Sequence, residues 1–133
     1  MRRKHWAFLL GMGLLLSLSL ALALAQPPFT IERVSVASDG TQGNGSSGAW
    51  ELPSIALSAD GRFVAFVSHA SNLVSGDTNG VADVFVRDRQ TSATTRVSIA
   101  SDGSQGNDSV ESYGLALSAD GRFVAFVSRA SNL

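Results

Sequence analysis

The segment Ala56–Leu73 reads ALSADGRFVAFVSHASNL, and the segment Ala116–Leu133 reads ALSADGRFVAFVSRASNL. The two copies differ at a single position, where His69 of the first copy is replaced by Arg129 in the second. Self-similarity of this kind is typical of repeat proteins, in which each unit buries its apolar face against a neighbour. The second copy stops before the residues that follow the first copy. We therefore expect a repeat protein, and we expect this chain to be a piece of a longer one.

Short apolar runs separated by clusters of Gly, Asp, Asn and Ser make up the later part of the chain, which predicts an all-β fold. The most apolar run is Arg62–Ser68. One face of this run would carry Phe63, Ala65 and Val67, and the other would carry Val64 and Phe66. Apolar side chains on both faces predict a strand that is covered on both sides, inside stacked sheets.

The spacing of the repeat predicts the architecture. Asp60 and Asp120 lie 60 residues apart, and one such unit holds four short apolar runs. Four-stranded propeller blades repeat at about 40–50 residues, and the excess here lies in two long polar loops. We therefore expect an all-β fold of four-stranded antiparallel β-propeller blades, incomplete and fewer than two, after an N-terminal signal peptide.

The expected strands follow from the same pattern. One complete blade over residues 54–100 would hold Ser54–Ser58, Arg62–Ser68, Asp83–Asp88 and Thr94–Ala100. The truncated next blade over residues 113–133 would hold Tyr113–Ser118 and Arg122–Ser128. Thr30–Ala37 would be the outer strand of a neighbouring blade, or the strand that closes a ring of blades. Residues 30–133 together form the expected repeat segment.

The first 25 residues have the pattern of an export signal. Arg2, Arg3 and Lys4 precede the apolar run Trp6–Leu24, and Ala23-Leu24-Ala25 fits a signal-peptidase site. We expect cleavage after Ala25, with residues 26–29 as a linker. The alternative is an uncleaved anchor, because the run is nearly long enough to span a bilayer. The predicted location is the periplasm or the outside of the cell.

Charge and cysteine content exclude several classes of partner and chemistry. The chain has 11 acidic and 10 basic residues, and Arg2, Arg3 and Lys4 account for three of the basic ones, so 7 − 11 leaves a net charge of −4 after cleavage. A nucleic-acid partner or an anionic membrane surface would need a basic stripe instead. With no cysteine, the exported chain has no disulfide and no thiol nucleophile.

The string SADGRFVAFVS, at Ser58–Ser68 and again at Ser118–Ser128, resembles the blade motif of TolB-type β-propellers. This chain has Ala59 and Ala119 where that family usually has proline. The longer stretch Ser71–Ser98 is similar to a subgroup of exported bacterial propeller-repeat proteins. The resemblance implies a propeller fold and protein partners in the cell envelope, or further blades of the same fold. Propellers serve many functions, so the resemblance implies no specific activity.

The loop Asp77-Thr78-Asn79-Gly80-Val81-Ala82-Asp83 is the best candidate for a metal site. The two carboxylates and the amide oxygen of Asp77, Asn79 and Asp83 could bind a hard cation such as Ca²⁺. The alternative is a polar turn in which Asp and Asn side chains bond their own backbone. The sequence supports both interpretations and requires no cofactor.

The remaining candidates concern recognition and catalysis. Trp50 and Tyr113 lie in corresponding loops ahead of the inner strands, where they could form a binding surface or pack over a blade edge. Asp60 and Asp120 are expected in tight Asp-Gly hairpin turns. His69 is replaced by Arg129 in the second copy, so we expect a loop residue and no catalytic triad.

These features predict an exported, non-catalytic β-propeller protein that serves as a protein-binding or scaffold module. One alternative is an accessory propeller of an exported hydrolase or peptidase. Another is a surface array of repeats stabilised by calcium. We expect the isolated segment to associate with itself, because its apolar strands lack neighbouring blades.

Overall fold

The structure, a computed structural model, describes residues 31–48 and 54–133 of the chain. Its contacts separate residues up to Glu32 from a compact unit, Arg33–Leu133, and only this second unit is described below. The expected signal peptide, the linker and Trp50 lie outside the described residues. Among the described residues there is no helix, and none that could cross a membrane. The prediction of an all-β chain is confirmed for this part.

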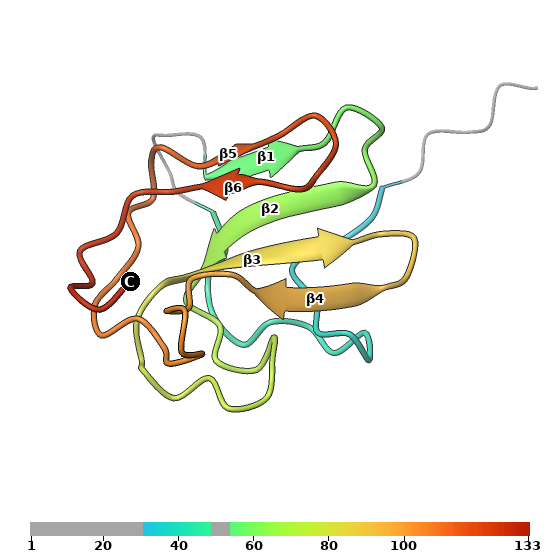
Figure 1. Cartoon of the computed structure of the whole chain (residues 1–133). Coiled ribbons are helices and arrows are strands. Elements are labelled where there is room, and N and C mark those ends of the chain that lie inside the picture. Colours follow the sequence, from blue (N-terminus) through green and yellow to red (C-terminus); the bar gives the residue numbers. More distant parts are fainter. Residues whose placement is uncertain (1–30, 49–53) are drawn as a thin grey trace, which may run out of the picture. The chain divides into compact units, whose positions relative to one another are not determined.

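A four-stranded antiparallel sheet forms the centre of the unit (Figure 1). Its strands, in both chain order and spatial order, are β1 (Ile55–Leu57), β2 (Phe63–Ser68), β3 (Asp83–Asp88) and β4 (Ala93–Arg96). In this register Phe66 of β2 lies opposite Ile55 of β1 and Phe85 of β3. The sheet confirms the predicted four-stranded antiparallel arrangement. That it is a propeller blade stays a prediction.

A short hairpin of two strands comes from the second copy of the repeat. It consists of β5 (Ala116–Leu117) and β6 (Val124–Ala125), which pair antiparallel in the register of β1 and β2. β5 contacts both β1 and β2, so the hairpin lies against the first sheet (Figure 1). The backbone N–H of Ala59 also donates to the carbonyl of Ala119 at 2.9 Å, which joins the tips of the two hairpins.

The hairpin turns are built identically in the two copies. In the first, the Ser58 hydroxyl donates to the Asp60 carboxylate at 2.6 Å and accepts the backbone N–H of Phe63 at 2.9 Å. In the second, Ser118 makes the same two bonds at 2.6 and 2.9 Å. Such local bonds lower the pKa of both Asp60 and Asp120 below the ordinary value, and the Ser hydroxyl is the largest cause. The Ser-x-Asp-Gly sequence therefore specifies the turn locally.

A second feature that the two copies share is an asparagine clamp that holds the long Gly/Ser loop of each copy. The Asn44 side chain donates to the Ser71 hydroxyl at 3.1 Å and accepts the Ser71 backbone N–H at 2.9 Å. Asn107 makes the same two bonds to Ser131 at 3.0 and 2.9 Å. The side chain of Asn72 completes the first clamp by donating to the Gln42 carbonyl at 2.8 Å. Each clamp ties a loop to the end of the following hairpin.

The described residues of the predicted outer strand Thr30–Ala37 form no strand in the structure, only a single bridge, Val36 to Gln42. That the segment belongs to a neighbouring blade stays a prediction. The chain turns back immediately, because the Ala37 N–H donates to the carbonyl of Thr41 at 2.8 Å. The segment is held beside β4 by side chains instead of a backbone ladder, with the Thr94 hydroxyl donating to the Val36 carbonyl at 2.6 Å.

Most of the other predicted strands are shorter in the structure than the sequence suggests. β3 has the predicted bounds, whereas β1 and β2 lose terminal residues and the strand expected over Thr94–Ala100 ends at Arg96. The strands expected over Tyr113–Ser118 and Arg122–Ser128 shrink to two residues each. Apolar composition marks a strand's centre, but its ends depend on how many partner residues are available for pairing.

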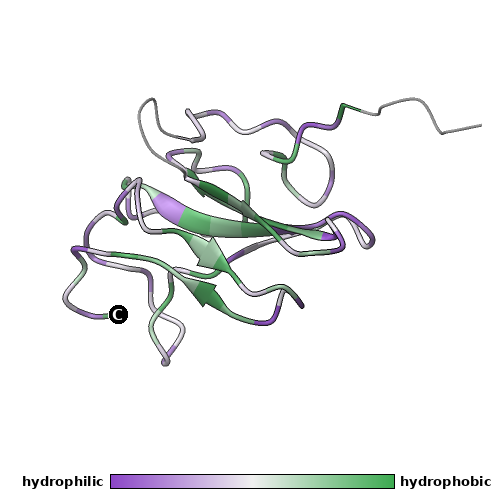
Figure 2. Ribbon diagram, turned by 90° about the horizontal axis from the view of Figure 1, so that it is seen from above, coloured by the Kyte–Doolittle hydropathy of each residue, from purple (hydrophilic) through white to green (hydrophobic). Residues whose placement is uncertain are grey.

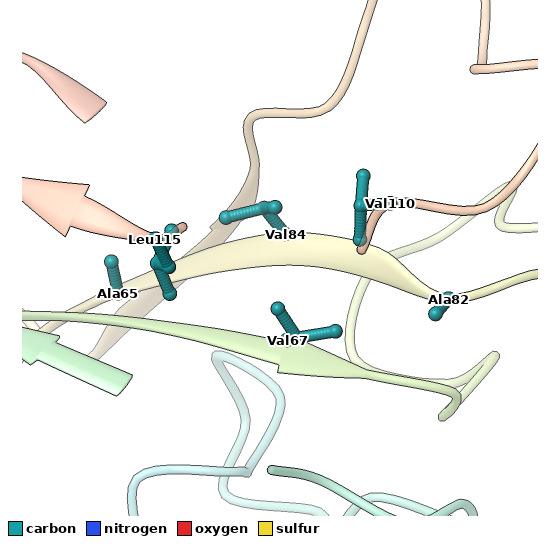
Figure 3. Close-up of a cluster of buried hydrophobic side chains, with 6 residues drawn as sticks. All are labelled: Ala65, Val67, Ala82, Val84, Val110 and Leu115. Carbon is teal, nitrogen blue, oxygen red and sulfur yellow. The ribbon is translucent and has the colours of Figure 1, made fainter. Parts of the chain in front are cut away.

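The central strands β2 and β3 are rich in hydrophobic residues (Figure 2), which form a buried cluster on each face of the sheet. The prediction of two buried faces is confirmed for β2. On one face, side chains from β2 and β3 pack against the segment that follows β4, and Figure 3 shows this cluster: Ala65, Val67, Ala82, Val84, Val110 and Leu115. On the other face lie Phe66, Ala70, Leu73 and Phe85, with Val34 against them. The rings of Phe66 and Phe85 stack at 5.8 Å between centroids. Both faces of β2 and β3 are thus largely removed from water.

Candidate functional site

The predicted metal-site residues lie at one end of the sheet. Asp77 lies in the loop between β2 and β3, Asp83 begins β3, and Arg96 ends β4. The Arg96 Nη1 atom lies 3.0 Å from Asp77 Oδ1 and 3.6 Å from Asp83 Oδ2. All three side chains are almost fully buried. The antiparallel meander places the start of β3 beside the end of β4, which brings the arginine to both carboxylates.

Asp83 is bonded through both carboxylate oxygens. The Ser98 hydroxyl donates to Oδ1 at 2.5 Å, and the Asn79 side-chain amide donates to Oδ2 at 3.0 Å. Ser98 also accepts the backbone N–H of Val84 at 3.0 Å, so it joins the chain after β4 to the start of β3. Hydrogen bonds at both oxygens offset the cost of burying this side chain.

Electrostatics at Asp77 reflect the shared guanidinium. Burial raises the pKa of Asp77, the negative charge of Asp83 raises it further, and Arg96 lowers it. The Nε atom of Arg96 is buried and has no hydrogen-bond partner among the described residues. One arginine thus pairs with two carboxylates. The cluster carries one excess negative charge when all three groups are ionised.

The structure brings Asp77, Asn79 and Asp83 together, and the Arg96 guanidinium lies close to both carboxylates. Asn79 directs its amide nitrogen, a donor, at Asp83, and its oxygen faces the backbone N–H of Val81 at 3.4 Å. Among residues 31–48 and 54–133, no group of three His, Cys, Asp or Glu side chains could hold a metal. As arranged, these residues fit a buried ion pair better than calcium, and the calcium site stays a prediction.

Gln105, from the second copy, closes the same loop from outside. Its Oε1 atom accepts from Arg96 Nη1 at 2.9 Å and from the backbone N–H groups of Thr78 and Asn79 at 3.1 and 3.2 Å. Its Nε2 atom donates to the Gly76 carbonyl at 2.9 Å and to the Thr78 hydroxyl at 3.0 Å. One side chain of the second copy therefore holds the long loop of the first.

Sequence reasoning missed Arg96 and Gln105, although the repeat carried a clue to both. The first copy has Arg33 and Gln42 at the corresponding places, and Arg33 Nη1 donates to Gln42 Oε1 at 3.0 Å. In the second copy the glutamine also binds the loop of the first copy between β2 and β3. The recurrence of an Arg and a Gln at the same spacing in both copies was the clue in the sequence. The loop at Thr78 and Asn79 that Gln105 binds could not be assigned without the fold.

Arg87 of β3 is a further buried cation, with 6% of its surface exposed. Its Nη1 atom donates to the carbonyls of Ala37 and Ser92 at 3.2 and 2.7 Å and to the Thr94 hydroxyl at 3.1 Å. The Nε atom of Arg87 is buried without a hydrogen-bond partner in the described part of the chain. Arg87 thus attaches the segment before the first loop to the sheet through backbone carbonyls.

The predicted recognition residues are placed only in part. Tyr113 lies in the segment before β5 with 46% of its surface exposed, which leaves its ring available to a partner. Trp50 lies outside the described residues, so a surface shared by the two aromatics stays a prediction. His69 is exposed at the end of β2, as expected for a loop residue. Its counterpart Arg129 pairs with Glu111.

Comparison with known proteins identifies no relative: no family model, no curated protein and no solved structure matches this chain.

Proposed function

We propose that this chain is part of an exported, non-catalytic β-propeller protein of TolB-like sequence, serving as a protein-binding or scaffold module in the periplasm or outside the cell. The observation that carries the proposal is the packing of the second copy on the face of the first sheet. Val67 and Val84 of that sheet pack with Val110 and Leu115 of the second copy. Face-to-face packing of consecutive four-stranded units is how propeller blades bury their apolar surfaces.

The use of the polar side chains supports a scaffold role. Asp60 and Asp120 bind their own turns, and Asn44 and Asn107 hold corresponding loops. A side chain that makes the same backbone-holding bonds in both copies has a structural task in each. Such a scaffold would present its long polar loops to a partner, and loops on a rigid framework are the usual place for recognition.

Tyr113 is the described residue best suited to contact a partner protein. It is exposed on a loop, and tyrosine combines a large apolar ring with a hydroxyl that can hydrogen-bond, which suits it to binding sites. The net charge after signal cleavage, −4 by the count above, favours a partner with a complementary positive surface over nucleic acid.

The experiment expresses the full chain with a C-terminal tag in a Gram-negative host and measures its mass in separated cell fractions. We expect a periplasmic or secreted species that begins at Gln26. Cross-linking in the envelope fraction should then capture protein partners, and Tyr113→Ala should reduce capture whereas His69→Ala, an exposed control, should not. A cytoplasmic, unprocessed chain would contradict the export part. Hydrolase activity that persists through purification would contradict the non-catalytic part.

A further inference from the structure

The chain contains two Asn-Gly pairs, Asn44-Gly45 and Asn79-Gly80. Asparagine is a chemically labile residue, and a glycine after it leaves the next backbone nitrogen open to approach the side-chain amide. Neither glycine N–H has a hydrogen-bond partner among the described residues, so both nitrogens are free to react. The local chemistry of the two pairs is the same, and their surroundings in the fold must distinguish them.

Deamidation at such a pair needs neither an enzyme nor a cofactor. The glycine backbone nitrogen attacks Cγ of the asparagine, and the bond between Cγ and Nδ2 breaks. The glycine N–H proton leaves with Nδ2 as ammonia, and a succinimide ring remains. Water then opens the ring at one of its two carbonyl carbons and gives aspartate with a normal or a β-linked backbone. Water thus replaces ammonia, and nothing is oxidised or reduced.

The first pair is locked by its contacts. Both polar atoms of the Asn44 side chain are bonded to Ser71, with Nδ2 donating to the hydroxyl at 3.1 Å and Oδ1 accepting the backbone N–H at 2.9 Å. A Cβ on Gly45 would lie 2.7 Å from backbone atoms of His69 and Ala70, so this glycine packs directly on the neighbouring segment. Its backbone cannot rotate toward the Asn44 side chain without breaking these contacts.

The second pair is open at its glycine. Gly80 is exposed, and no described atom lies within 4 Å of the place where its Cβ would be. Its φ angle is +70°, and a glycine can leave this conformation easily. The Asn79 side-chain oxygen accepts the N–H of Val81 at 3.4 Å. This weak bond turns the side-chain carbonyl toward the backbone that follows, which is the side from which the attack comes.

We propose that Asn79-Gly80 is a site of spontaneous deamidation in the folded protein, and that the reaction weakens the contact between the two copies of the repeat. Asn79 Nδ2 donates to Asp83 Oδ2 at 3.0 Å and to the carbonyl of Gly106, in the second copy, at 3.2 Å. Deamidation replaces this donor by a carboxylate oxygen, which can only accept. The inference goes beyond the proposed function and does not depend on it.

The new carboxylate would enter a site that already holds more acid than base. Asp77 and Asp83 share the Arg96 guanidinium at 3.0 and 3.6 Å, and the two carboxylate side chains are 4% and 2% exposed. A third negative charge beside them shares the same cation, and like charges that are largely removed from water repel each other strongly. The Gly106 carbonyl repels it as well. The loop between β2 and β3 therefore loses its Asn79 bond to the second copy.

The first test follows the reaction in the natural full chain. The purified protein is kept in mildly alkaline buffer, and its peptides are mapped by mass spectrometry at successive times. A deamidated peptide is heavier by the exchange of NH₂ for OH, so both pairs are measured in one sample. The same chain in concentrated urea gives the rates without the fold. We expect the ratio of the Asn79 rate to the Asn44 rate to be at least about tenfold larger in the folded chain than in urea.

The second test measures the effect on stability. Asn79→Asp reproduces the aspartate product, and Asn79→Ala removes the same two hydrogen bonds without adding a charge. In buffer with a chelator, we expect Asn79→Asp to melt at a lower temperature than Asn79→Ala, and both to melt below the natural chain. The deamidated natural chain, separated by ion exchange through its additional negative charge, should also melt below the unmodified chain. This measurement stands even where a variant fails to fold.

Three outcomes would overturn the proposal. They are the same ratio of rates in the folded chain and in urea, a faster reaction at Asn44 than at Asn79 in the folded chain, and equal melting temperatures for Asn79→Asp and Asn79→Ala. None of these results bears on export or on partner capture. A failure here would therefore leave the cell-fraction experiment standing, and a cytoplasmic chain would leave the deamidation result standing.

Discussion

Ser98 shows how a single hydroxyl can hold the sheet together. It is fully buried, donates to Asp83 and accepts the N–H of Val84, so it satisfies two groups at the start of β3. Buried polar groups are costly only when they lack partners. The serine therefore lets a charged residue begin an otherwise apolar strand.

Replacing Ser98 by alanine should destabilise the protein. Ser98→Ala leaves the Val84 N–H and one oxygen of Asp83 buried without this partner, and we expect a loss of about 1–3 kcal/mol in the free energy of unfolding. Urea unfolding of the full chain measures the loss. Ser35→Ala is the matched control from the first copy, and an equal loss there would contradict the role of the buried hydroxyl.

The Arg62–Asp88 pair should make stability depend on acidity. The Arg62 guanidinium, through its hydrogen bonds, is the main cause that holds the pKa of Asp88 well below its usual range. A carboxylate with a depressed folded-state pKa contributes stability above its unfolded pKa of about 3.9, and loses it as the pH falls toward the folded value. The pair therefore stabilises the fold at neutral pH and not in strong acid.

We expect Arg62→Gln to lower the urea midpoint at neutral pH and to have a progressively smaller effect as the pH falls below about 3.9, where the carboxylate becomes protonated in the unfolded state. Arg122→Gln is the matched control, because Arg122 has no ion pair in the described part of the chain. A loss for Arg62→Gln that is the same at every pH would show that packing, not charge, dominates at this position.

At the level of elements, the hairpin turn is encoded locally but its surroundings are not. Gly61 and Gly121 adopt positive φ angles of 68° and 73° in the same Asp-Gly turn. A Cβ at Gly61 would have no neighbour closer than 3.7 Å, whereas a Cβ at Gly121 would overlap the ring of Phe63. The second turn packs on Phe63 of the first sheet, and the first turn has no such contact at its glycine.

Substitution of each glycine by alanine therefore distinguishes the cost of backbone strain from the cost of disturbing the contact between the copies. Gly61→Ala should cost about 1–2 kcal/mol, the penalty of a left-handed conformation for an L-residue. Gly121→Ala should cost about 1–3 kcal/mol more, because the Phe63 ring must move. Thermal unfolding of both variants measures the difference. Equal losses would mean that the β5–β6 hairpin does not pack on Phe63 in solution.

Strand positions followed from sequence better than strand lengths did. The run Asp83–Asp88 was bounded correctly, since Phe85 and Val84 alternate between two apolar faces and polar residues flank them. Thr30–Ala37 has the same β-rich composition as the run after β3, but its described residues have no strand to pair with. Composition cannot report whether a pairing partner is present.

At the scale of the whole molecule, the buried cluster of Asp77, Asp83 and Arg96 could stabilise the fold as an ion pair or as a calcium site. We expect calcium at about 1 mM, in the range of weak extracellular sites, to leave the melting temperature unchanged because the Arg96 guanidinium already occupies the position between the two carboxylates. Arg96→Gln should lower the melting temperature, since it leaves two buried carboxylates without a cation.

Calorimetry in the presence of calcium, and then of a chelator, measures the melting temperatures of the natural chain and of Arg96→Gln. If calcium raises the melting temperature of Arg96→Gln and leaves that of the natural chain unchanged, the loop can hold a cation only when the arginine is gone. A rise in the melting temperature of the natural chain would support the predicted calcium site of Asp77, Asn79 and Asp83.

The sequence by itself determined the all-β class, the doubled unit, the Asp-Gly turns and the two-faced apolar strand over Arg62–Ser68. These features depend on alternation and turn chemistry, which act over a few residues. Only the tertiary structure decided that Arg96 and Gln105 close the loop of Asp77 and that Phe63 meets Gly121. Those contacts join residues about 20 to 60 positions apart, and such pairs become neighbours only once the strands are paired and the second copy packs on the first.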